Sequence, residues 1–271
     1  MHLFRYANNF PFGGNQTAIG IVTSLGLATN LKLCLDAGDS NSYAGGASWL
    51  DTAGSGYDFF RGTTSGADAS DPTFNGTQGG RSSAEYFSVD GGDYFTYDTT
   101  NETWMNNIHK DSAQWTVAMW FYTTTLTTAR ALMGTDNGDA ANVGFDILAS
   151  ATDSMRVRVS NGSGSLAKDY NPGTPDFASG WNFLAVRLDE TDGTNGLSIV
   201  LNANTGTTSG TYTSPSASNA TSTLQILAEG NNVLPARSGD RIGMFWMWEG
   251  TALSTTNLSS IYTASRTRYG V

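Results

Sequence analysis

Turn dipeptides recur along this chain at short intervals, and they restrict its fold more than any other feature. Asn161-Gly162, Asp192-Gly193, Asn195-Gly196 and Asp90-Gly91-Gly92 supply residues that tolerate a positive φ, as two-residue hairpin turns require. The segments between the turns are short and contain many aromatic and β-branched residues. This pattern is typical of an all-β protein in which antiparallel strands form two packed sheets.

The alternation of side chains places the strands. In Trp115–Phe121 every second residue is large and apolar, and in Met155–Val159 apolar residues alternate with arginine. The sequence predicts strands at Leu31–Asp36, Glu85–Val89, Tyr94–Tyr97, Trp115–Tyr122, Ala131–Gly134, Gly144–Ala149, Met155–Ser160, Trp181–Leu188, Leu197–Asn202, Leu224–Ala228 and Arg241–Trp248. In the last of these, Ile242, Met244, Trp246 and Trp248 are expected to share one face. A short helix, Thr255–Ala264 with Ser254 as its N-cap, is expected near the C-terminus.

The composition excludes some classes of function. Only 14% of the 271 residues are charged and 11% are aromatic, which favours a packed core over disorder. The net charge of −10 disfavours nucleic acid as a partner. Cys34 is the single cysteine, so no internal disulfide forms, and its apolar neighbours predict a buried, unreactive thiol.

The segment 1–30 differs from the rest of the chain, because its only charged residue is Arg5. Its apolar residues include Phe4, Tyr6, Phe10, Phe12, Ile19, Ile21 and Leu25. Water should not wet so many apolar side chains. Either the segment adds a strand to its own domain, or it is an arm that docks on a neighbouring subunit, and we favour the arm. The expected domains are therefore an arm at 1–30 and a sandwich at 31–271.

We expect neither secretion nor insertion into a membrane. The first residues lack the features of a secretory signal. The apolar stretch Ala18–Ala28 is too short for a bilayer, which requires about 20 residues. The protein is therefore expected to remain in the cytoplasm where it is made, or to leave it inside a larger particle.

Several motifs occur in a characteristic order. They are Leu31–Gly38 and Trp49-Leu50-Asp51 near the start, Trp115–Phe121 and Trp181–Val186 in the middle, and Asp240–Gly243 and Arg268-Tyr269-Gly270 at the end. Residues 31–271 thus resemble the LamG-like jelly-roll domains of the concanavalin A-like superfamily, in particular those of bacteriophage structural proteins. The resemblance implies an antiparallel two-sheet jelly-roll sandwich, and it does not include the segment before residue 31.

This resemblance and the uncharged leader together predict a virion protein. We expect a non-enzymatic capsid decoration or cement protein, or a tail-associated subunit, on the exterior of a bacteriophage particle. Its partners would be major capsid or tail subunits and further copies of itself in a homo-oligomer.

A lectin-like module for host-surface glycans is the alternative. Its sugar-stacking candidates are Tyr43, Trp49, Tyr57 and Trp104. At each position a ring that packs inside a loop is the competing interpretation.

A glycoside hydrolase is the third and least favoured reading. Hydrolases of this superfamily carry a Glu-x-Asp-x-x-Glu motif, whereas the nearest string here, Glu190–Asn195, lacks the last carboxylate. We therefore expect no enzyme activity.

No cofactor is expected, with calcium as the one candidate. Asp136, Asn137 and Asp139 place hard oxygen ligands close together, as do Asp90 and Asp93. Ordinary Asx turns are the competing and favoured interpretation.

Overall fold

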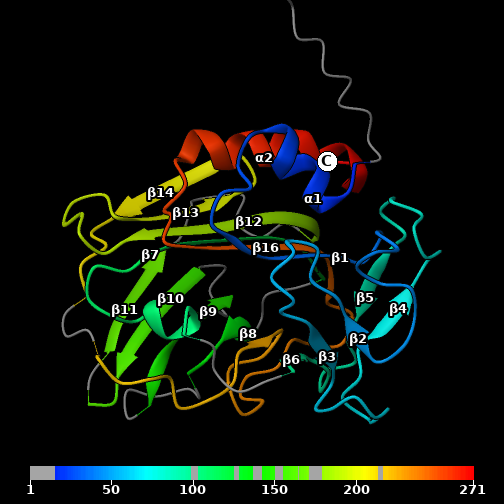
Figure 1. The fold of residues 1–271 in the computed structure, drawn as a ribbon, viewed down its shortest axis with the longest axis horizontal. Coiled ribbons are helices and arrows are strands. Elements are labelled where there is room, and N and C mark those ends of the chain that lie inside the picture. The colour runs from blue at the N-terminus through cyan, green and yellow to red at the C-terminus, as the bar shows by residue number, and fades with distance from the viewer. Residues whose placement is uncertain are drawn as a thin grey trace, which may run out of the picture.

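The computed structural model describes residues 16–98, 103–124, 128–136, 142–149, 155–163, 179–212 and 216–271, and the backbone of 165–170. The described strands form two antiparallel sheets, and two helices lie on the outer face of one of them (Figure 1). The molecule therefore has three layers: helices, a first sheet and a second sheet. The all-β, two-sheet sandwich that the sequence predicts is confirmed.

The first sheet has the strand order β14-β13-β12-β7-β16-β5-β4, and β1 pairs with β16 beside β5. Its strands are β1 (Leu31–Asp36), β4 (Thr73–Asn75), β5 (Tyr86–Ser88), β7 (Gln114–Thr123), β12 (Gly180–Asp189), β13 (Leu197–Leu201), β14 (Asn204–Thr208) and β16 (Arg241–Glu249). The second sheet has the order β11-β10-β9-β8-β15-β6-β3-β2. Its strands are β2 (Ser48–Trp49), β3 (Phe59–Arg61), β6 (Phe95–Tyr97), β8 (Arg130–Gly134), β9 (Val143–Ala149), β10 (Met155–Asn161), β11 (Ser165–Tyr170) and β15 (Gln225–Ile226). A 3-10 turn, η1 (Met105–Asn107), precedes β7.

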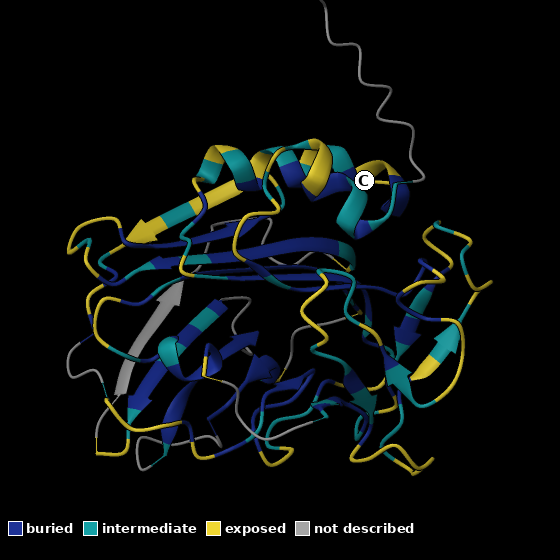
Figure 2. Cartoon of the chain, in the orientation of Figure 1, coloured by how far each residue is buried: buried dark blue, intermediate teal, exposed yellow. Residues whose placement is uncertain are grey.

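The central strands of the first sheet are buried on both faces (Figure 2). In β7, Val117 and Met119 pack into the core between the sheets. Ala118 and Trp120, which point the opposite way, pack into a second cluster beneath the helices. The apolar run of β7 therefore reflects two packing layers, not one.

A β-bulge in β16 corrects one expectation from the sequence. The register against β7 shifts between Ile242 and Phe245. Ile242 consequently belongs to the core between the sheets, whereas Met244, Trp246 and Trp248 face the helices. The four residues do not share one face, because the extra residue of the bulge reverses the alternation.

The C-terminal helix, α2 (Thr255–Tyr269), begins where the sequence predicts and runs five residues further. The Ser254 side chain accepts a hydrogen bond from the backbone N–H of Asn257 and caps its start. Gly270, at φ 73°, ends it in the left-handed conformation that favours glycine. Leu258 and Ile261 are buried against the first sheet.

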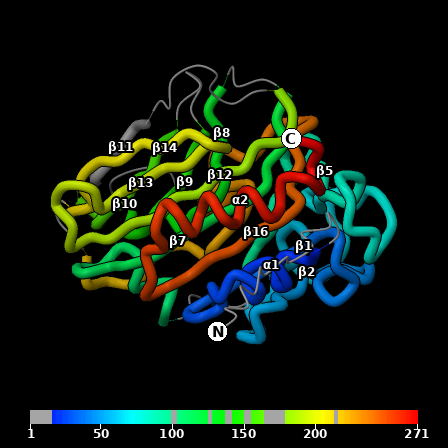
Figure 3. Tube along the Cα trace, turned by 90° about the horizontal axis from the view of Figure 1, so that it is seen from above, coloured from blue at the N-terminus to red at the C-terminus, as the bar shows by residue number. Residues whose placement is uncertain are grey.

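The described part of the leader packs on its own domain. Thr17 caps a short helix, α1 (Ala18–Ser24), which lies on the outer face of the first sheet beside β1 and β16 (Figure 3). The indole N–H of Trp246 donates to the Ala18 carbonyl at 3.1 Å, and that of Trp248 donates to the Leu27 carbonyl at 2.7 Å. Residues 16–30 are thus part of the sandwich domain, and the predicted boundary at residue 30 does not separate them from it.

The arm interpretation is therefore wrong for Ile21, and Ile19 and Leu25 also make apolar contacts within their own chain. Ile21 is 1% exposed beneath α1, and Ile19 and Leu25 pack partly buried against the same cluster. Their apolar side chains pack within the chain. They do so from a helix, whereas the alternative considered from the sequence was an extra strand. Phe4, Tyr6, Phe10 and Phe12 lie outside the described residues.

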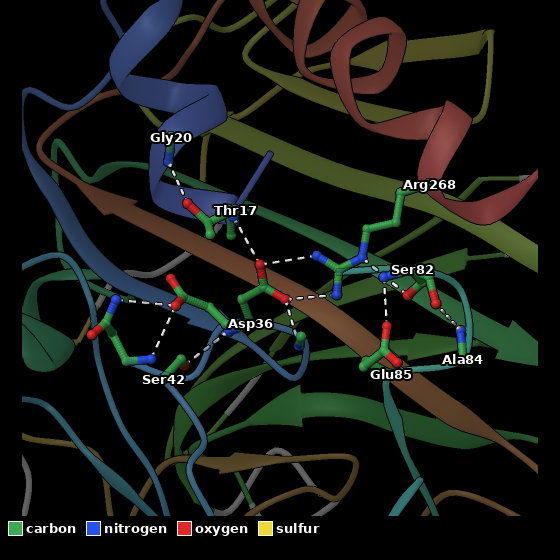
Figure 4. Close-up of polar contacts among 12 residues, drawn as sticks. Thr17, Gly20, Asp36, Ser42, Ser82, Ala84, Glu85 and Arg268 are labelled. Carbon is green, nitrogen blue, oxygen red and sulfur yellow. Dashed lines mark hydrogen bonds and ion pairs between the residues drawn. The ribbon is translucent and has the colours of Figure 1, made fainter. Parts of the chain in front are cut away.

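Asp36 joins both helices to the sandwich (Figure 4). Its carboxylate accepts hydrogen bonds from the Ala18 N–H at the start of α1 and from the Gly38 N–H. It also accepts hydrogen bonds from both Nη atoms of Arg268, which lies in the last turn of α2. One buried carboxylate thus fixes the ends of two helices.

Among the described helices, neither is both long enough and apolar enough to cross a bilayer.

Candidate functional site

Three aromatic side chains and one arginine form a row across the outer face of the first sheet. Trp181 of β12 lies directly opposite Tyr122 of β7, and Tyr122 lies opposite Arg241 of β16. Tyr86 of β5 points to the same face, because its neighbour Phe87 points into the core. We call these four residues the aromatic–arginine patch.

The patch lies where α2 ends. The last turn of α2 approaches the chain segment before β5, where Arg268 Nε donates to the Ser82 carbonyl at 3.2 Å. Neither helix buries the four side chains completely, and each remains partly exposed. Beside β5, Asn75 of β4 donates to the Ser88 hydroxyl at 2.9 Å. The patch is therefore an accessible part of the outer face of the first sheet, next to the part that the helices cover (Figure 1).

The rings support each other edge to face. The centroid of Trp181 lies 5.6 Å from Tyr122 and 6.1 Å from Tyr86, with interplanar angles of 74° and 69°. On its inner side Trp181 packs against buried Tyr269, with centroids 4.5 Å apart. Such contacts fix the orientation of each ring while one side of the group stays open to solvent.

Arg241 lies between the two tyrosines. Its Cζ is 4.2 Å from the ring centroid of Tyr122 and 4.5 Å from that of Tyr86. The two rings come from the strands on either side of β16. Cation–π contacts hold the flat face of the guanidinium, so that its N–H edge is available for other partners.

The polar atoms of the patch have no partners among the described residues. No described carboxylate or carbonyl accepts a hydrogen bond from Arg241, and no described group bonds to the hydroxyls of Tyr86 and Tyr122. The patch thus combines apolar ring surface with free donors and acceptors. This is the chemistry of a shallow site for a small polar molecule that also has an apolar face.

The sugar-stacking residues expected from the sequence are elsewhere, and three of them are buried. Trp49 is 0% exposed between Phe87 and Phe95 at one end of the core. Tyr43 and Trp104 are also buried, and Tyr57 is half-buried between Tyr97 and Trp104. The lectin expectation is wrong for Tyr43, Trp49 and Trp104, because these rings are buried in the hydrophobic core and cannot reach a sugar in solution.

The residues expected as calcium ligands lie in different surroundings. Asp136 is buried, where its carboxylate accepts a hydrogen bond from Ser160 and lies 3.5 Å from Arg158. Asn137 and Asp139 lie outside the described residues. In the described part of the chain no group of three or more His, Cys, Asp or Glu residues has an arrangement that could hold a metal ion. At the other candidate, Asp93 accepts the backbone N–H of Asp90, as in a turn.

Asp136 belongs to a buried charge cluster on the outer face of the second sheet. One guanidinium, that of Arg158, contacts three carboxylates, those of Asp136, Asp146 and Glu229. Burial raises the pKa of Asp146 to about 8, although Arg158 opposes the shift. Burial also raises the pKa of Glu229 to about 7, again against the effect of Arg158. All three carboxylates are inaccessible, which makes this cluster a weaker candidate for a binding site than the patch.

Analysis of the sequence missed the patch. It predicts all four strands involved, but it does not show which strands are neighbours or which residues face each other. A usable signal was present: Tyr86, Tyr122, Trp181 and Arg241 each have a neighbour in sequence that belongs to the inner face. Only the register across β5, β16, β7 and β12 brings them together.

The fold has relatives among solved structures, although no family model and no curated protein matches the chain. A structure described as the crystal structure of the receptor binding domain matches with a TM-score of 0.58 at 12% identity, over 90% of this chain and 53% of that one. The binding domain of botulinum neurotoxin DC in complex with SialylT matches at 0.53 and 12%, over 88% and 52%. Trypanosoma rangeli sialidase in complex with sialic acid matches at 0.55 and 10%, over 88% and 33%. The chain therefore spans about half the length of the first two and a third of the sialidase, and at these identities the likeness shows a shared β-sandwich fold alone.

Proposed function

We propose that this protein is a non-catalytic glycan-binding β-sandwich, and that the aromatic–arginine patch is its sugar-binding surface. The observation that carries the proposal is the row of partly exposed rings, Tyr86, Tyr122 and Trp181, on the outer face of the first sheet. A sugar ring has one apolar face of C–H groups and a rim of hydroxyls. Aromatic rings pack against the apolar face, and nearby polar groups bond the hydroxyls.

The fixed geometry of the patch supports this role. Trp181 contacts both tyrosine rings, and the strands are joined by backbone hydrogen bonds, so the three rings lose little conformational entropy when a ligand binds. The unpartnered tyrosine hydroxyls supply donors and acceptors at the edge of the stacking surface. Proteins of this fold include one solved with SialylT and one solved with sialic acid, which agrees with the proposal.

The other two functions considered from the sequence have less support. The virion role depended on an apolar leader in need of a partner, and the described part of that leader is satisfied on its own sheet. A virion role and particle partners stay predictions that concern Phe4, Tyr6, Phe10 and Phe12. A hydrolase would need accessible carboxylates, whereas Glu190 is buried and accepts the backbone N–H groups of Ser112 and Tyr212.

A glycan array followed by titration calorimetry tests the proposal. We expect the full chain to bind at least one glycan class, and Trp181→Ala and Tyr86→Ala to weaken that binding at least tenfold. Stacking of this kind contributes about 0.5–1.5 kcal/mol beyond the buried area. Tyr57→Ala is the matched control, since it also removes a half-buried ring but lies outside the patch.

Melting temperatures separate loss of binding from loss of folding. Absence of binding to every glycan by the wild-type protein would contradict the proposal. Equal losses for Tyr57→Ala and Trp181→Ala would also contradict it, because the effect would then not be specific to the patch.

A further inference from the structure

We infer that the glycan bound by the patch carries a carboxylate, and that Arg241 is its ligand. The inference rests on the proposed function and adds the class of sugar: an acidic monosaccharide unit, as in sialylated or uronic acid glycans. The other arginines of the chain provide the comparison for Arg241.

The buried arginines of the described chain are paired with acids. Arg268 binds Asp36, Arg130 binds Asp240 through Nη1 at 2.6 Å, and Arg158 contacts three carboxylates. Arg61, at the surface, still donates to the Gly46 and Pro72 carbonyls. The chain has 24 acidic residues and 14 basic ones, so acidic partners are plentiful.

Arg241 is held in place by two rings, and it has no acidic partner among the described residues. Tyr86 and Tyr122 hold its guanidinium at 4.5 and 4.2 Å, and no described residue accepts a hydrogen bond from it. An arginine that served only folding would be expected to bond a backbone carbonyl or one of the many carboxylates. A guanidinium held flat by two rings keeps its fork of N–H donors unused, and that fork matches a carboxylate.

The surroundings select a carboxylate on a sugar over other anions. The net charge of −10 repels dense polyanions, which disfavours nucleic acids and heavily sulfated polymers. A single carboxylate experiences much less of this repulsion. Trp181, next to Tyr122 in the same row, provides ring surface for the pyranose that carries the carboxylate.

The test compares saccharides that differ only in the acid. Calorimetry would measure binding of 3′-sialyllactose against lactose, and of trigalacturonate against its methyl ester, to the full chain. We expect at least one acidic saccharide to bind about tenfold more tightly than its neutral counterpart, since a hydrogen bond to a charged group contributes substantially. The two pairs also show whether the acid is a sialic or a uronic acid.

Arg241→Gln should reduce this tenfold ratio to about one, while binding of the neutral saccharide persists. Arg266→Gln is the matched control: Arg266 is exposed and contacts the Tyr262 ring at 5.8 Å, so the variant removes the same charge outside the patch. It should keep the ratio.

Equal binding of acidic and neutral saccharides by the wild-type protein would overturn the inference and leave the proposed function standing. A ratio that persists in Arg241→Gln, or that disappears equally in Arg266→Gln, would also overturn it. Binding of no saccharide at all would overturn the proposed function, and this inference with it.

Discussion

Arg268 and Asp36, 232 positions apart, form a buried bidentate ion pair in which Nη1 and Nη2 each donate to one carboxylate oxygen, at 3.0 and 2.8 Å. The two side chains are 2% and 1% exposed. The same carboxylate accepts the first N–H of α1. This pair therefore connects the first described helix, the first strand and the last helix of the domain.

Asp36→Asn should lower the free energy of unfolding by about 3–5 kcal/mol, because it leaves the Arg268 guanidinium buried without a counter-charge. Chemical denaturation at neutral pH measures the change. Asp111→Asn is the control, since Asp111 is exposed and the loss there should stay below about 0.5 kcal/mol. Similar losses in the two variants would mean that the pair contributes no more than a surface charge.

The indole of Trp246 should stabilise α1 specifically. Trp246→Phe keeps a ring but leaves the Ala18 carbonyl without its donor, which costs about 1–3 kcal/mol for a buried group. Amide hydrogen exchange within Ala18–Ser24 should therefore accelerate about tenfold or more. Trp49→Phe is a close control, because the Trp49 indole N–H is buried without a hydrogen-bond partner in the described structure. Unchanged exchange in Trp246→Phe would show that apolar packing alone holds the helix.

Gly243 is predicted to accept no side chain. A Cβ there would collide with the ring of Tyr269, which stacks on Trp120 with centroids 4.4 Å apart and also contacts Trp181 of the patch. Gly243→Ala should lower the free energy of unfolding by about 1–3 kcal/mol through overpacking. Glycan binding should weaken as well, since displaced Tyr269 supports Trp181.

Gly92→Ala is the control for that experiment, because a Cβ at Gly92 meets no atom within 4 Å. Its melting temperature and glycan affinity should both match those of the wild-type protein. A stable Gly243→Ala variant with full affinity would show that Tyr269 moves aside without cost.

Much of the fold could be predicted from the sequence, because its central strands have a clear apolar pattern and are bounded by turns. β1 has the predicted bounds, and β7 and β12 are each longer than predicted by one residue at both ends. Cys34 is buried as expected. The two- and three-residue strands β2, β3 and β4 escaped prediction, because segments so short carry no measurable alternation.

Interactions between distant segments could not be predicted in the same way. Motifs from the two ends of the chain, which carry the LamG-like resemblance, contact each other in the fold. A Cβ at Gly38 would collide with Arg268, and a Cβ at Gly243 would collide with Tyr269. No local pattern reveals such contacts. The patch escaped for the same reason, since its members are neighbours only through the register of four strands.

The sequence contains signals for the helix α1, but the lack of charge in this segment favoured a different interpretation. Thr17 is a good N-cap, and Ala18, Ile21 and Val22 have helical spacing. The absence of charge suggested an intermolecular contact instead. The structure shows that the aromatic outer face of the first sheet, with Trp246 and Trp248, provides the partner surface within the chain.

The cluster around Arg158 should make the protein less stable as the pH rises above neutrality. Burial raises the pKa of Asp146 to about 8 and that of Glu229 to about 7, so the folded state binds protons that the unfolded state has released. A raised carboxyl pKa contributes stability that is fully present below the unfolded value, near 4, and is lost as the pH rises through the folded value. Between pH 5 and pH 8 the unfolding free energy should therefore fall, by at most about 1.4 kcal/mol per pH unit for each proton.

Asp146→Asn should flatten this dependence, because the amide does not titrate and still fills the space beside Arg158. Denaturant titrations at pH 5, 6, 7 and 8 would compare the slopes of the wild-type protein and the variant. Asp68→Asn is the control, since Asp68 is exposed and its pKa is lowered by hydrogen bonds from Ser70, so it is ionised throughout this range. A wild-type slope of zero, or a slope that persists unchanged in Asp146→Asn, would show that Asp146 binds no proton near neutral pH. In that case Arg158 would face three buried negative charges in the described part of the chain, an arrangement whose desolvation cost makes it the less stable alternative.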